Sequence, residues 1–258
     1  MTGAVQITAV AGIPDIAPGD DLAAILGDCL DAAGMALRDG DILCIAHKVF
    51  SKAEGCIIDL ASVTPSEQAR DLAGQLNKDP RKVEVVLGQS RRVVRSFRRP
   101  NQDEGTIICE HRLGFISANA AVDESNAGAA GTVITLPDDP DASAGRLGVA
   151  LEARFGCTIG VVMTDTFGRP WRLGQVNVAI GLHRVPATRP DIGGTDAWGR
   201  PLLVTEPAFS DELAAASGLV VQKAAKTPVV LMRGLGWEPA KTTSARDIIR
   251  ASGEDVFR

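Results

Sequence analysis

The feature that most constrains the fold of this 258-residue chain is a helix-ending glycine followed at once by a short β-branched run. Gly156 follows an amphipathic stretch, and residues 157–163 have the composition and length of a buried strand. A polar run, residues 164–175, comes directly after it. Because open sheets gather ligands at the carboxyl ends of their strands, Asp165 is predicted to lie in a binding site. The alternative is a surface turn in which Asp165 caps the backbone and the nearby arginines are solvated.

Hydrophobic periodicity and turn residues predict the other elements. In chain order they are a helix from residue 22 to near 40, a strand at 41–50, a helix to 76 opened by a capping box at 64–67 with Pro65 at its first position, a helix from 80, antiparallel strands within 92–119, a helix at 141–155, a helix capped by Ser210, and a strand at 228–232. Glycines and prolines interrupt residues 171–201, which are predicted to form a long irregular functional segment. The uneven alternation favours an α+β fold, with a mixed or antiparallel sheet core and flanking helices, over a doubly wound sheet.

Composition restricts the class of protein. With 45% apolar and 23% charged residues, the chain is typical of a globular protein. Five cysteines without a C-x-x-C pair indicate reduced thiols, and the absence of a leader or a long apolar run predicts a cytoplasmic protein without a membrane partner. The net charge of -5 and the 4% aromatic content argue against a nucleic-acid partner, although five arginines cluster within residues 91–99.

Once the common catalytic and nucleotide-binding motifs are excluded, the remaining candidate site is a group of oxygen ligands near basic residues. The sequence has no P-loop, dinucleotide-binding, H-E-x-x-H or G-x-S-x-G motif. Asp123 and Asn126 lie in one polar run, and Asp165 and Thr166 lie in another. Such hard ligands suit Mg²⁺ or Mn²⁺ bound together with substrate phosphates. Sequence spacing alone does not show that the two runs meet, and Asp123 also fits an ordinary turn aspartate.

Basic residues near these runs are candidates for binding anions. Lys52 could contact a phosphate, or it could be a solvated lysine paired with Glu54. Arg169 and Arg172 could each offer a bidentate fork to a carboxylate or phosphate, or could stack on the tryptophan between them. The pattern around His47 fits a structural histidine better than a catalytic one.

An ordered set of motifs gives the chain a specific resemblance. Residues 165–181 meet the pattern D-T-x-G-R-P-W-R-x-G-Q-x-x-x-A-I-G, and further matching segments occur in the same order at residues 12–16, 51–55, 119–126 and 233–234. In these motifs, which span residues 5–235, the chain resembles the coenzyme F420-0:γ-glutamyl ligase family in its stand-alone form. The resemblance implies a ligase domain over residues 1–235, with two possible subdomains, and a C-terminal tail at 236–258. It also implies an α+β fold assembled as an intertwined homodimer.

The resemblance implies a GTP-dependent ligase that adds L-glutamate to coenzyme F420-0 and then continues with γ-linked additions. The acceptor carboxylate would be activated as an acyl phosphate, with Mg²⁺ or Mn²⁺ required and K⁺ an additional possible cofactor. Carried over by position, Asp123, Asp165 and Thr166 resemble the metal ligands, and Asp165 and Lys52 the catalytic residues. The GTP contacts carried over are Ile13, Pro14, Asp15, Ile16, His47, Lys52, Asn126, Gln222 and Lys223. By charge alone, Arg169, Arg172 and Arg200 are predicted to bind the acceptor.

The chain departs from the family pattern at several places, which also include His47, Leu113 and the pair His183-Arg184. Ala121 occupies a position where the family usually has glycine, residues 221–225 lack the glycines of the usual loop, and residues 188–194 lack the family's D-x-R-G pattern. Two alternatives follow: a ligase of the same mechanism that acts on a different carboxylate, or a non-catalytic nucleotide-binding subunit. A metal-dependent phosphohydrolase is a third.

Overall fold

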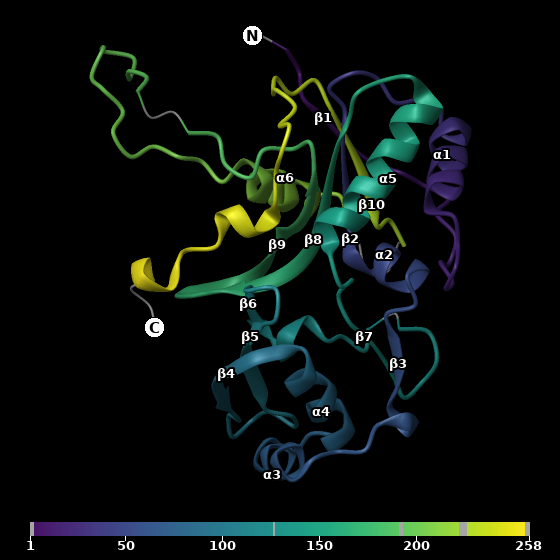
Figure 1. The fold of residues 1–258 in the computed structure, drawn as a ribbon, viewed down its shortest axis with the longest axis vertical. Helices are drawn as coiled ribbons and strands as arrows, with labels where there is room; N and C mark the ends of the chain where they lie inside the picture. Colours follow the sequence, from purple (N-terminus) through teal and green to yellow (C-terminus); the bar gives the residue numbers. More distant parts are fainter. Residues whose placement is uncertain (1–2, 126, 191–192, 222–225, 256–258) are drawn as a thin grey trace.

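A five-stranded sheet flanked by helices and a smaller unit of strands and helices make up the fold (Figure 1). The computed structural model describes residues 3–125, 127–190, 193–221 and 226–255. In chain order its elements are β1 (Gln6–Ala9), α1 (Leu22–Ala32), β2 (Ile42–Ala46), α2 (His47–Ala53), β3 (Ile57–Asp59), η1 (Leu60–Ser62), α3 (Glu67–Leu76), α4 (Pro80–Gly88), β4 (Ser90–Phe97), β5 (Thr106–His111), β6 (Ile116–Ala118), η2 (Asn119–Ala121), β7 (Thr132–Ile134), α5 (Pro140–Phe155), β8 (Gly160–Arg169), β9 (Arg172–His183), α6 (Phe209–Ser217), β10 (Val229–Arg233), η4 (Ala245–Ile248) and η5 (Ser252–Glu254).

The main sheet has the strand order β1-β10-β2-β8-β9. Strands β2 and β8 are parallel, with Ile42 opposite Gly160 and Ala46 opposite Thr164, whereas the other neighbouring pairs are antiparallel. The sheet is therefore mixed, and the predicted α+β class with flanking helices is confirmed. Strands β2 and β8 run in the same direction, and β2 ends opposite Thr164, whereas β8 continues to Arg169. Asp165 therefore lies within β8 and not in a polar run that follows the strand, because pairing with β9 extends β8 beyond the predicted residues 157–163.

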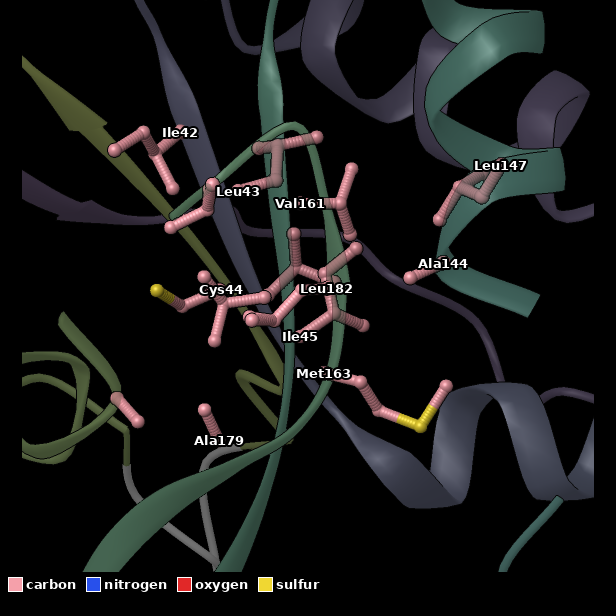
Figure 2. Packing of buried hydrophobic residues seen from close by; sticks show 14 of the residues in the cluster. Ile42, Leu43, Cys44, Ile45, Ala144, Leu147, Val161, Met163, Ala179 and Leu182 are labelled. Atoms are coloured by element: carbon pink, nitrogen blue, oxygen red, sulfur yellow. The ribbon is translucent and has the colours of Figure 1, made fainter. Parts of the chain in front are cut away.

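Helices cover both faces of this sheet. Figure 2 shows Val161 and Met163 of β8 extending toward Ala144 and Leu147 of α5. Cys44 of β2 extends to the other side, where its Sγ donates to the carbonyl of Leu213 in α6 at 3.7 Å. Strand β2 is almost entirely buried, which explains its continuous apolar sequence.

A second hydrophobic core forms between α3, α4 and the three-stranded sheet β4-β5-β6. Val83 of α4 and Ile107 of β5 are fully buried in it. The antiparallel strands predicted within residues 92–119 are confirmed, and so is the helix that begins at Pro80 behind the cap residue Asp79.

The first predicted helix is confirmed but ends eight residues early. Helix α1 stops at Ala32 instead of near Gly40, because Gly34 takes a left-handed backbone with φ of +67° and the amide of Met35 turns back to the carbonyl of Leu30. The helix predicted at 141–155 is confirmed as α5, and Gly156 ends it at φ +66° as expected. The predicted strands at 157–163 and 228–232 correspond to β8 and β10.

The strand predicted over residues 41–50 is wrong in its second half. Strand β2 ends at Ala46 and helix α2 follows directly. His47, Phe50 and Ser51 are all buried, at the i, i+3 and i+4 spacing of a helix face. Lys52 therefore lies on a helix and not at the end of a strand.

The irregular segment predicted at 171–201 is wrong over most of its first half. Arg172–His183 forms β9, which pairs with β8 through a tight turn where Trp171 has φ of +57°. Apolar residues alternate along this strand at Val176, Val178, Ile180 and Leu182, as expected for a strand with one packed face.

Two predicted helix caps are displaced. Ser66, not Thr64, caps α3 by accepting from the amide of Ala69 at 3.2 Å. Ser210 lies within α6, which begins at Phe209 behind Ala208, and its buried hydroxyl donates to the carbonyl of Ala187 at 3.0 Å instead of capping the helix. In the described ranges no helix has both the length and the apolar character needed to cross a membrane.

Candidate active site

One cavity of about 260 Å³ lies at the carboxyl end of the parallel strand pair. Its walls come from α2, the middle of the β8–β9 hairpin, the turn after η2 and the segment before β10. Nine of the residues predicted to form the site line this cavity: Ile13, Pro14, Asp15, Ile16, His47, Lys52, Asp123, Asp165 and Thr166. The two predicted carboxylates, Asp123 and Asp165, thus meet at one place although they come from separate segments.

Asp165 is held at the cavity wall by its own strand. Its Oδ1 accepts the amide of Thr166 at 2.7 Å, and its side chain keeps 16% of its surface exposed. Thr166 Oγ1 donates to Asn177 Oδ1 of β9 at 2.9 Å. The hairpin partner therefore fixes the rotamer of Thr166, and the carboxylate of Asp165 retains free lone pairs for a cation or for solvent.

His47 bridges α2 and β8. Its Nε2 lies 3.5 Å from Asp165 Oδ1, and its Nδ1 lies 3.1 Å from Ser51 Oγ. Burial lowers the pKa of this imidazole below its ordinary value, although the charge of Asp165 opposes that shift. A neutral ring with its proton on Nε2 accepts from Ser51 and presents a donor to Asp165.

Asp123 lies in a turn that is tied to α2. Its Oδ1 accepts the amide of Ser125 at 2.7 Å, and Lys48 Nζ donates to its Oδ2 at 2.6 Å. Burial raises the pKa of this carboxyl, but the hydrogen bonds from Lys48 and Ser125 outweigh that effect and hold the pKa below its ordinary value. Lys82 of α4 pairs with Glu124 in the same turn and so connects the turn to the second core.

The backbone that leads to Asp123 is strained. Asn119, Ala120 and Ala121 have φ of +52°, +49° and +56°, the left-handed region that L-residues seldom occupy in succession. Immediately afterwards, the amide and carbonyl of Asp123 pair with Ile134 of β7. Ala121 is the position where the family resemblance leads us to expect glycine, and its left-handed backbone is one that glycine adopts without strain.

A charged pair lies at the mouth of the cavity. Lys226 Nζ contacts the Asp15 oxygens at 2.9 and 3.1 Å, and this hydrogen bond and the lysine charge lower the pKa of Asp15. Lys52, one turn after Lys48 on α2, also lines the cavity.

The three arginines predicted to bind the acceptor lie outside the cavity lining. Arg169 and Arg172 flank the tip of the β8–β9 hairpin, where Arg169 Nη2 donates to the carbonyl of Leu173 at 3.2 Å. Arg200 lies in the segment between β9 and α6, with its amide bonded to Asp196 Oδ1 at 2.8 Å. Asn126, Gln222 and Lys223 lie outside the described residues.

Comparison with known proteins identifies the family. The model of the family described as F420-0:Gamma-glutamyl ligase matches residues 12–234. The chain belongs to this family. A protein of Methanopyrus kandleri named coenzyme F420:L-glutamate ligase is 44% identical over 94% of this chain and 93% of its own length. A protein of the same name from Methanothermobacter thermautotrophicus is 38% identical over 98% and 99% of the two chains.

Within this family member, the hallmark run at 165–181 corresponds to the β8–β9 hairpin, so the motif encodes both a cavity wall and the strand that braces it. Other polar residues of the cavity wall escaped the sequence interpretation, among them Lys48, Gln175, Asn177 and Lys226. The signal for Lys48 was its position immediately after His47, which the incorrect strand assignment obscured. Alternation along β9 would have placed Gln175 and Asn177 on one face of that strand.

Proposed function

We propose that this protein is a GTP- and divalent-metal-dependent ligase that joins L-glutamate to coenzyme F420-0 through an amide bond and then adds further γ-linked glutamate. Family membership and the names of its relatives support the ligase activity on F420-0. The observation that carries the proposal in the structure is the convergence of Asp123, Asp165 and Thr166 on one cavity that also presents Lys52.

The oxygen atoms at this cavity fit Mg²⁺ or Mn²⁺. Among the described residues, no three His, Cys, Asp or Glu side chains form a metal-binding cluster. Mg²⁺ is nevertheless usually held by one or two carboxylates, with phosphate and water oxygens completing its octahedron. Asp123 and Asp165 would supply the carboxylates and Thr166 a hydroxyl, while a nucleotide would supply phosphate oxygens. K⁺, a possible additional cofactor, would also bind through oxygen atoms.

The reaction requires positioning and charge neutralisation, and it requires no protein nucleophile. A carboxylate oxygen of the acceptor attacks the γ-phosphorus of GTP, which gives an acyl phosphate and GDP. The amine of L-glutamate then attacks the acyl carbon, forms the amide and releases phosphate. The divalent cation would neutralise charge on the transferred phosphoryl group.

The residues of this chain have distinct tasks in that scheme. Lys52 offers a point charge to phosphate oxygens from the wall formed by α2. His47 orients Asp165 through the contact of its Nε2 with Asp165 Oδ1, and Ser51 in turn positions the ring through Nδ1. Residues 13–16 also line the cavity, and they are the segment that would contact the nucleotide.

The acceptor and a second protomer are proposed to meet near the hairpin tip. Arg169 and Arg172 provide positive charge at the tip, and Arg200 provides it on the separate segment between β9 and α6, for a polyanionic acceptor. Leu173 at that tip is 98% exposed, and Trp198, Leu203 and Val204 in the following segment are exposed by 76% or more. Exposed large apolar side chains on these two projecting segments are typical of residues covered by a partner, which supports the homodimer.

The test is an assay with GTP, Mn²⁺, L-glutamate and F420-0, read by mass spectrometry. The expected product carries one and then more added glutamate residues, with GDP formed in proportion. GDP formation and glutamylation with another acid but not with F420-0 would favour a different acceptor. GTP binding without turnover would favour a binding subunit.

The site residues are tested by Asp165→Asn, which keeps the size of the side chain and its acceptor for the Thr166 amide. Loss of one ligand charge is expected to reduce the rate by about 100-fold or more and to leave folding intact. The matched control is Asp138→Asn, because that carboxylate is 97% exposed and lies outside the cavity lining. Full activity of Asp165→Asn would remove the assigned role.

A further inference from the structure

The ammonium of Lys48 is held by oxygen atoms of the turn that carries Asp123. Lys48 Nζ donates to Asp123 Oδ2 at 2.6 Å, to the carbonyl of Ser125 at 2.7 Å and to Ser125 Oγ at 2.6 Å. Its side chain is only 19% exposed. Three short contacts use all three protons of the ammonium, so this lysine is bound in the way that a small cation would be.

These contacts occupy the carboxylate that the proposed function assigns to a metal. Asp123 Oδ1 accepts the amide of Ser125 at 2.7 Å, and Oδ2 accepts from both Lys48 and the Ser125 hydroxyl, the latter at 2.9 Å. A divalent ion on Oδ2 would lie against the lysine charge at hydrogen-bond range. Both cations cannot keep these contacts, because their repulsion would act in a cavity wall partly shielded from water.

We propose that Lys48 is the internal counter-cation of Asp123 and that the divalent metal replaces it. In the metal-free protein the ammonium neutralises the carboxylate and organises residues 123–125, and metal binding displaces it into the cavity. This inference rests on the metal site of the proposed function and adds an exchange step to it. Metal affinity is then lower than the oxygen ligands alone would give, because each binding event must break the contacts of Lys48.

Two other lysines of the same cavity differ from Lys48 in their surroundings. Lys226 pairs with Asp15 at the mouth, where both side chains are more than two-thirds exposed. Lys52 lies one helical turn after Lys48 and lines the cavity without a hydrogen bond or ion pair to another described side chain. Lys226 is therefore the matched control, since its removal deletes one positive charge from the cavity but none from Asp123.

Calorimetric titration with Mn²⁺ in the absence of nucleotide tests the exchange. Lys48→Met is expected to bind Mn²⁺ about tenfold more tightly than wild type, because a repelling charge has been removed from the ligand. Lys226→Met is expected to stay within about twofold of wild type. If wild type binds Mn²⁺ and Lys48→Met binds it equally or more weakly, the replacement of Lys48 by the metal is contradicted, while the metal site itself is retained. Absence of Mn²⁺ binding in wild type and both variants overturns the metal site and the exchange together.

A second measurement uses the wild-type protein and is independent of how a variant folds. Reductive methylation followed by peptide mass spectrometry reports the accessibility of each lysine amine. Saturating Mg²⁺ is expected to increase methylation of Lys48 severalfold and to leave Lys226 unchanged. Protection of Lys48 that is the same with and without saturating Mg²⁺ overturns the displacement.

Discussion

Two glycines in helix α5 provide a matched pair that tests how tightly this helix packs on the hairpin carrying Asp165. A Cβ at Gly148 would lie 2.1 Å from Cδ2 and 2.7 Å from Cγ of His183, whereas a Cβ at Gly145 would come no closer than 4.0 Å to the same ring. Both positions are in the helix interior, so an alanine at either gains about 1 kcal/mol of helix propensity. The difference between Gly148→Ala and Gly145→Ala therefore isolates the steric cost.

That cost is expected to be about 1–3 kcal/mol. The His183 ring cannot move away by rotating its far end, because the close atom Cγ is bonded directly to its Cβ. Glu152 Oε2, 3.6 Å from His183 Nε2, confines the ring from the other side. Gly145→Ala should be more stable than wild type and Gly148→Ala less stable.

Urea unfolding followed by circular dichroism measures the free energy of unfolding of both variants. Adding His183→Ala to Gly148→Ala should recover part of the loss, because it removes the obstructing ring. Equal stability of the two single variants would refute the packing argument, and so would a double variant that is no more stable than Gly148→Ala.

The remaining predictions concern pH and assembly. Burial, and then the charges of Arg112 and Arg91, lower the pKa of His111 to about 4. The imidazole of the unfolded chain therefore binds a proton near pH 6.5, whereas that of the folded protein stays neutral until the pH approaches 4. Stability is therefore fully present above pH 6.5 and is lost as the pH falls toward 4, by about 3 kcal/mol for this residue. Urea unfolding at several pH values should show a shallower loss for His111→Asn, and an identical slope would contradict the assignment. Light scattering should give twice the chain mass of 27.0 kDa for wild type and the single-chain mass for Leu173→Asp, and a monomeric wild type would end the dimer proposal.

Elements with strong local signals were predictable from the sequence. Helix α5 has Asp139 accepting from the amide of Ala142 at its start and Gly156 in a left-handed conformation at its end, so its bounds follow from local chemistry. The first half of β8 and the antiparallel strands β4 to β6 carry β-branched residues, and turns bound them. For these elements tertiary contacts agree with local propensity.

Elements whose conformation depends on distant contacts were not predictable. His47–Ala53 has the apolar content of a strand continuing β2, and it is helical because one face of it packs into the core. Strand β9 contains residues that disfavour regular structure, and its twelve residues are held by pairing with β8 and by packing against α5 and α6. The glycines within this segment predicted turns, but pairing with β8 holds the segment as a strand.

The residue types of the candidate site were predictable, but their meeting was not. Oxygen ligands at Asp123 and Asp165 could be selected by type, whereas their shared cavity depends on strand order. Lys48 was missed because the predicted strand over residues 41–50 gave the wrong direction for its side chain. In the structure Lys48 lies on helix α2. The roles of Asn126, Gln222 and Lys223 stay predictions.

The parallel pairing of β2 with β8 is what brings the site together. The last residue pair of the two strands joins Ala46 to Thr164. The residues that follow, His47 and Asp165, therefore lie side by side, with His47 Nε2 at 3.5 Å from Asp165 Oδ1. Helix α2 begins at that point and directs Lys48 to the turn of Asp123, which β7 holds through Ile134. A one-residue slip of β2 against β8 would send the side chains of β2 to the opposite face and separate these groups. The same register that buries β2 therefore fixes the positions of both carboxylates relative to α2, and stability and chemistry depend on one pairing.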